Sequence, residues 1–260
     1  MPSSRSPRRP RPSSSRDSYW EAAKRPLQIL AFLLPLIIFY ELALTFLLQS
    51  QESVRTVLAH KYLLRFFDAF HIAPEGGLHL GGIAIVAVLL TWHILNRDPW
   101  RISYPTLGLM VVETILVTLP LLVLSQLIQR PLAVEGFLAA NPQSFQGLGL
   151  LSKSAISIGA GLYEELMFRM LLIAVIHTLL VDVGKASNQL GAGIAVVVSA
   201  LTFAAYHPLE NAGQMLFLFL AGLYFGGVYV LRGFGIVVGV HALYDCVTFA
   251  MQAYASHGSN

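Results

Sequence analysis

Residues 147–180 read GLGLLSKSAISIGAGLYEELMFRMLLIAVIHTLL, a stretch in which apolar runs enclose a few charged side chains. A helix rises about 1.5 Å per residue, so about 20 apolar residues cross the roughly 30 Å hydrocarbon core of a bilayer. This stretch of 34 residues is longer than one perpendicular crossing needs. It predicts either a strongly tilted helix or a short interfacial piece before Ser152 followed by the true span.

Comparable apolar stretches recur along the rest of the chain. Of the 260 residues, 55% are hydrophobic and only 12% are charged, whereas about 25% of residues are charged in an average soluble domain. We therefore predict an all-α fold, a polytopic transmembrane helix bundle of about seven spans, or eight if residues 147–180 form two segments. The expected spans are Leu27–Gln49, Leu78–Leu95, Pro105–Ile128, Gly147–Leu180, Leu190–Tyr206, Ala212–Leu231 and Phe234–Ala253.

The first 26 residues differ from the rest, because they are rich in Ser, Pro and Arg and hold seven of the 17 basic residues. Such a composition cannot bury a core. We predict a disordered basic tail over residues 1–26 and a transmembrane domain over residues 27–255. The positive-inside rule places the tail in the cytoplasm of an integral, multi-pass membrane protein. The net charge of +3 belongs largely to the tail, so no nucleic-acid partner is expected.

Residues 50–77, between the first two spans, mix basic and aromatic side chains. This pattern predicts an amphipathic helix that lies in the membrane interface. The sequence Pro74-Glu75-Gly76-Gly77 then marks the end of that helix.

Two adjacent carboxylates and a guanidinium occupy the middle of residues 147–180. Glu165 and Arg169 are four residues apart, about 40° around a helix, and can form an ion pair, whereas Glu164 and Arg169 are about 140° apart. Ionisable groups within hydrocarbon are costly and therefore indicate function. Because Glu164 lacks this local partner, it is the candidate general base.

Two histidines lie at the end of the fifth predicted span and within the seventh. His207 follows the fifth predicted span and precedes a proline, so it is expected at the mouth of a cavity. His241 and Asp245 share one face of the seventh span at i, i+4. Such a pair can bind a metal, orient an imidazole or stabilise an oxyanion.

Other polar or small residues in the spans are assigned structural roles. Glu41, His93 and Glu113 are expected to pair among themselves or to reach interfacial water, with the lining of a substrate cavity as the alternative. The glycines at 222, 226 and 227 form a small-xxx-small face that allows close helix packing.

The three motifs together resemble the CPBP intramembrane proteases, which include the type II CAAX prenyl endopeptidases and Abi-like proteins for bacteriocin processing or immunity. The first family motif, Glu-Glu-x-x-x-Arg, matches Glu164, Glu165 and Arg169. The second, Phe-x-x-x-His, matches Phe203 and His207, and the third, His-x-x-x-Asn or Asp, matches His241 and Asp245. The resemblance covers a protease-like core at about residues 147–253.

The resemblance implies hydrolysis of a peptide bond within the membrane. Glu164 and His207 would activate a water, His241 and Asp245 would stabilise the oxyanion, and Glu165 and Arg169 would support the site. The same side chains, Glu164, His207, His241 and Asp245, could instead hold a divalent metal such as zinc, so the enzyme is either a glutamate protease or a metalloprotease. Its expected partners are the lipid bilayer and a peptide or membrane-protein substrate, prenylated in some relatives.

Two other function classes use the same residues. Buried carboxylates and histidines can form the relay of an ion or proton transporter, and a non-catalytic immunity protein could retain the motifs for folding. A protease requires Glu164, His207 and His241 around one water-sized site, whereas a relay requires them spread across the membrane. In straight helices His207 and His241 would lie at depths that differ by about 10 Å or more. The protease reading therefore requires tilted, offset or broken helices.

Overall fold

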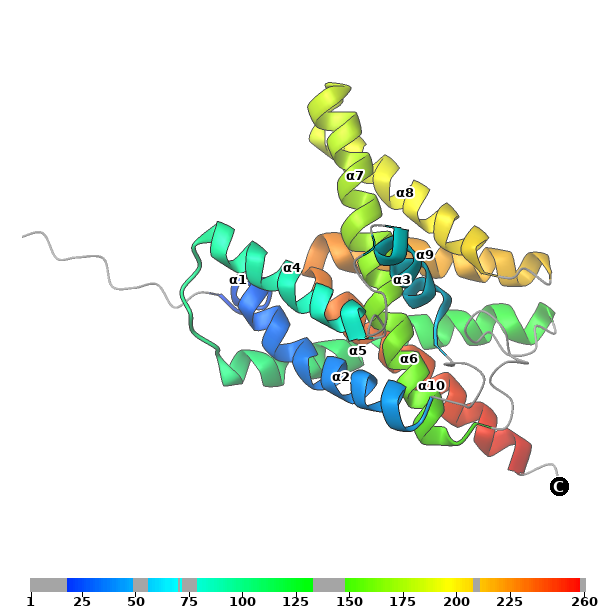
Figure 1. Cartoon of the computed structure of the whole chain (residues 1–260). Helices are drawn as coiled ribbons and strands as arrows, with labels where there is room; N and C mark the ends of the chain where they lie inside the picture. The colour runs from blue at the N-terminus through cyan, green and yellow to red at the C-terminus, as the bar shows by residue number, and fades with distance from the viewer. Residues whose placement is uncertain are drawn as a thin grey trace, which may run out of the picture.

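The computed structural model describes residues 18–48, 56–69, 71, 79–132, 148–207 and 211–257. All regular elements in these ranges are helices (Figure 1), which confirms the predicted all-α, polytopic bundle. The helices are α1 (Tyr19–Ala22), α2 (Pro26–Phe46), α3 (Leu58–Ala69), α4 (Leu80–Asn96), α5 (Tyr104–Leu132), α6 (Leu150–Glu165), η3 (Leu166–Leu172), α7 (Ile173–Thr178), η4 (Leu179–Val183), α8 (Asn188–Tyr206), α9 (Ala212–Arg232) and α10 (Phe234–His257).

Six of the described helices are long and apolar enough to span a membrane, and each corresponds to a predicted span. The remaining predicted span is α4, which has only 17 residues and is therefore about 26 Å long. The long stretch runs unbroken from Leu150 to Val183. The alternative of a separate interfacial piece before Ser152 is therefore wrong. The side of the membrane on which the N-terminus lies stays a prediction from charge.

The C-terminal part of the predicted tail is ordered, in contrast to the expectation of disorder up to residue 26. Tyr19 in α1 donates a hydrogen bond to Glu113 of α5, which also pairs with Arg232 at the end of α9. Burial and the neighbouring Glu113 raise the pKa of Tyr19 to about 12, so its phenol keeps its proton. Residues 1–17 lie outside the described part of the chain.

The predicted amphipathic segment contains α3, and the ends of that segment lie outside the described residues. His60 of α3 is fully buried. Its Nδ1 lies 2.9 Å from Thr56 Oγ1 and 3.0 Å from the Tyr40 hydroxyl, and its ring stacks on Tyr163 at 4.4 Å. These contacts attach α3 to both α2 and α6.

The α10 helix is the most enclosed of the spans. In its most apolar stretch of 18 residues, 72% of the residues are buried inside the protein, against 22–39% in the other five spans. A Cβ added at Gly161 of α6 would lie only 2.9 Å from both the Val238 oxygen and the Ala242 nitrogen of α10. Glycine at this position therefore allows the backbones of α6 and α10 to approach closely, one turn from Glu164 and beside His241.

The helices α7 and α8 form a hairpin whose tip extends away from the rest of the bundle, while α8 also packs against α9 (Figure 1). The Ser199 hydroxyl of α8 donates to the Phe168 carbonyl in η3 at 2.8 Å, which sets the register of the two antiparallel segments. The helix from Leu150 to Val183 is called the long helix below. Because α8 runs back along its second half, the C-terminal end of α8 reaches the level of Glu164. This offset removes the predicted difference in depth between His207 and His241.

Gly222 and Gly226 of α9 pack against α8, as predicted, whereas Gly227, which the prediction included, does not. A Cβ at Gly222 would lie 2.9 Å from the Ala200 Cα, and one at Gly226 would lie 2.8 Å from a Val196 methyl. We therefore expect Gly222→Ala to lower the free energy of unfolding by about 1–3 kcal/mol, because backbone atoms cannot yield without separating the helices. Thermal unfolding in detergent or nanodiscs measures this loss.

Gly227 provides the matched control on the same helix, since a Cβ there would meet nothing within 4 Å. Gly227→Ala is expected to leave stability unchanged, or to raise it by up to about 1 kcal/mol through helix propensity. Equal effects of the two substitutions would contradict the packing role of Gly222.

Candidate active site

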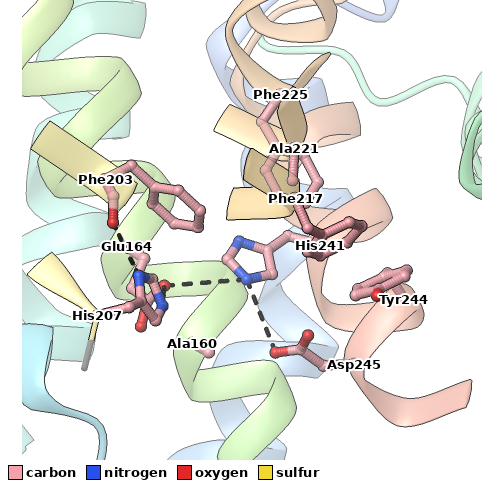
Figure 2. A pocket seen from close by; sticks show the side chains of 10 residues that line it. All are labelled: Ala160, Glu164, Phe203, His207, Phe217, Ala221, Phe225, His241, Tyr244 and Asp245. Carbon is pink, nitrogen blue, oxygen red and sulfur yellow. Dashed lines mark hydrogen bonds and ion pairs between the residues drawn. The ribbon is translucent and has the colours of Figure 1, made fainter. Parts of the chain in front are cut away.

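Three helices bring the predicted site residues together (Figure 2). The Glu164 Oε2 atom of α6 lies 3.6 Å from His207 Nε2, directly after α8, and 3.9 Å from His241 Nε2 of α10. Asp245 Oδ2, one turn further along α10, lies 3.7 Å from His241 Nε2. The four side chains therefore surround one small region, and each residue is at most 7% exposed.

The supporting pair also forms as predicted. Arg169 Nη1 lies 3.1 Å from Glu165 Oε1, and both side chains are fully buried. The guanidinium lies over the Phe203 ring at 4.3 Å and over the Phe225 ring at 5.1 Å, both favourable cation–π distances. A buried positive charge next to Glu165 thus balances one of the two adjacent carboxylates.

Hydrogen bonds determine which nitrogen of each histidine faces Glu164. His207 Nδ1 lies 2.8 Å from the Phe203 carbonyl oxygen, and His241 Nδ1 lies 2.6 Å from Glu165 Oε1. A carbonyl or carboxylate oxygen can only accept, so both Nδ1 atoms carry protons and donate. The Nε2 atoms of both rings are consequently directed at Glu164, where each can accept a proton or contact a substrate.

The long helix changes its winding just after the two carboxylates. The α6 helix ends at Glu165, and the π segment η3 starts at Leu166. A π turn widens the helix locally and is often found at functional sites. Here the segment carries Arg169 back toward Glu165 while Phe168 faces α8.

The four polar residues line a cavity of about 10 Å³. That is close to the minimum space for a single water molecule. The rest of the wall is apolar and aromatic, from Ala160, Phe203, Phe217, Ala221, Phe225 and Tyr244 (Figure 2). The site can therefore hold one water against a carboxylate and two imidazoles, in surroundings of low polarity.

The donor atoms of the site belong to the types that zinc prefers, and each histidine is oriented through its other ring nitrogen. Their arrangement fits a metal less well. In the described part of the chain, no group of three or more His, Cys, Asp or Glu side chains is placed to hold a metal ion.

Glu41, His93 and Glu113 lie outside this cavity and contact other residues rather than one another, so the expected pairing among them is wrong, and their contact with interfacial water stays a prediction. Glu113 binds Arg232, and Glu41 contacts His79 at 2.6 Å and accepts from Tyr163 at 3.2 Å. His93 packs edge-on against the Trp100 ring at 4.4 Å.

Sequence reasoning missed two aromatic residues of the site. Phe225 of α9 stacks on the His241 ring at 4.6 Å, with 17° between the planes. Tyr206 packs edge-on against the His207 ring at 5.0 Å. Neither position stands out in a chain with 15 phenylalanines and 10 tyrosines, so only the packing reveals them.

Residues 147–247 match the family model described as type II CAAX prenyl endopeptidase Rce1-like. This match confirms the resemblance stated from the motifs, and it includes Glu164, Glu165, Arg169, His207, His241 and Asp245. The match supports a peptidase of the CAAX type that is an integral, multi-pass membrane protein. Searches of curated proteins and of solved structures found no match.

Proposed function

We propose that this protein is an intramembrane endopeptidase in which Glu164 acts as the general base on a hydrolytic water. The observation that carries the proposal is the convergence of two imidazole Nε2 atoms on one carboxylate oxygen, at 3.6 and 3.9 Å, around a water-sized cavity. A general base must lie within hydrogen-bond reach of the proton that it takes, directly or through one water.

In the proposed reaction Glu164 takes a proton from the water while the oxygen of that water attacks the carbonyl carbon of the peptide. His207 Nε2, beside the same carboxylate oxygen, accepts a hydrogen bond from this water and orients it. The tetrahedral intermediate then collapses, the C–N bond breaks, and the proton held by Glu164 moves to the leaving amine. The products are a carboxylic acid and an amine, which balances the reaction.

His241 and Asp245 are proposed to stabilise the oxyanion of the intermediate. His241 donates from Nε2 when its ring carries a proton on each nitrogen, and Glu165 Oε1 holds its Nδ1 at 2.6 Å. Asp245 can donate only as the neutral acid. Donors placed in advance at the site of developing charge are among the largest contributions to catalysis.

The compact arrangement favours hydrolysis over an ion or proton relay. A relay requires its groups at successive depths, whereas the carboxylates and histidines of this site lie in mutual contact, 2.6 to 3.9 Å apart. The proposed substrate is a peptide or membrane protein. A prenylated C-terminal cysteine motif is the specific substrate that the matched family suggests.

The test uses the purified full chain in lipid vesicles with a membrane peptide that carries a C-terminal cysteine motif, with and without a prenyl group. Mass spectrometry in water enriched in ¹⁸O is expected to find one new carboxyl terminus that contains the label. Cleavage of the prenylated peptide alone would support the narrower substrate. Unlabelled products, or products formed equally by Glu164→Gln, would contradict the proposal.

A further inference from the structure

Tyr206 carries a buried hydroxyl group that the mechanism above does not use. In the described part of the chain, this hydroxyl oxygen is inaccessible to solvent and has no hydrogen-bond partner of ordinary geometry. Leaving a buried polar group unsatisfied destabilises the folded protein. Such a group beside a candidate active site therefore requires an explanation.

The surroundings of Tyr206 hold its side chain in place. It is the last residue of α8 and directly precedes His207. Its ring packs edge-on against Phe168 at 5.2 Å and against His207 at 5.0 Å, and the Tyr62 ring of α3 lies 6.2 Å away. The Tyr206 ring is thus packed among residues of the long helix, of the candidate active site and of α3.

The hydroxyl faces the backbone of Ala59 and the carboxylate of Glu164, with which it interacts electrostatically. The two histidines both contact Oε2 of Glu164. The Tyr206 hydroxyl is therefore a further donor beside the carboxylate of the candidate base.

We propose that Tyr206 is a positioning residue for the hydrolysis, whose hydroxyl donates a hydrogen bond to the Glu164 carboxylate. This inference rests on the proposed function, because it assigns Tyr206 a part in the same reaction. The hydrogen bond holds the carboxylate plane so that Oε2 stays directed at the water between His207 and His241. It also satisfies the buried phenol.

Removal of the hydroxyl should slow the reaction without weakening substrate binding. A hydrogen bond to a charged group contributes about 1.5–3 kcal/mol, so Tyr206→Phe is expected to lower kcat on the order of 10- to 100-fold, with KM within about twofold of wild type. Tyr62→Phe is the matched control, since that ring contacts Tyr206 but is 44% exposed. It is expected to keep kcat within about twofold.

A thermal-unfolding cycle tests the same contact without any substrate. If the hydroxyl donates to Glu164, Tyr206→Phe lowers Tm in the wild-type background but not in a Glu164→Ala background, because interacting residues are non-additive. Equal Tm shifts in both backgrounds would overturn the proposal, and so would an unchanged kcat in Tyr206→Phe. A wild-type protein that cleaves no peptide would overturn the proposed function alone, and the unfolding cycle would still decide whether the hydrogen bond exists.

Discussion

Replacement of Glu164 by glutamine is expected to lower kcat by about 10³-fold, within the 10²–10⁴ range of general acid–base catalysis, and to leave KM nearly unchanged. Glutamine has almost the same shape, so the contacts with His207 and His241 remain sterically possible. It cannot take a proton from water. Initial rates on the peptide substrate in vesicles measure the effect, which should appear in kcat because only the chemical step loses its base.

Glu41→Gln is the matched control for this substitution. Glu41 is also a partly buried carboxylate in a membrane helix, and it accepts a hydrogen bond from Tyr163, the residue next to Glu164 in the chain. It lies outside the catalytic cavity. Glu41→Gln should keep kcat within about threefold, since it changes no side chain that lines the cavity and affects the rate only through packing. Similar losses in both variants would show that charge in the bundle, rather than the base, controls the rate.

Arg169→Met is expected to have the largest effect on stability. The substitution leaves Glu165 fully buried with His241 as its only remaining polar contact among the described residues. Breaking a buried ion pair from one side typically costs about 3–5 kcal/mol. Loss of the guanidinium also removes its contacts with the Phe203 and Phe225 rings. We expect a clearly lower Tm in nanodiscs and weak expression.

The control for this effect removes both charges at once. The double variant Glu165→Gln, Arg169→Met has no uncompensated charge, so it should regain much of the lost stability, as replaced buried ion pairs often do. Lys153→Met tests the loss of a basic residue earlier in the same helix. If the double variant is as unstable as the single one, the guanidinium acts mainly through the aromatic rings rather than through Glu165.

Local features of this protein follow from the order of its residues. Apolar runs of about 20 residues must be helices in a bilayer, because every backbone polar group needs an internal partner there. The pair Glu165–Arg169 follows from helical periodicity alone. The motif spacing also pointed to the family that residues 147–247 match. These properties depend on neighbours within about one turn or one span of the chain.

The arrangement of the site depends on contacts between distant segments, and only the tertiary structure decided it. The register of α8 on the long helix, held by the Ser199–Phe168 contact, places His207 at the level of Glu164. The close approach at Gly161 brings in His241. Tyr206 and Phe225 acquire their neighbours in the same way. No periodicity encodes such contacts, because they arise from how whole helices slide and tilt against one another to pack side chains closely.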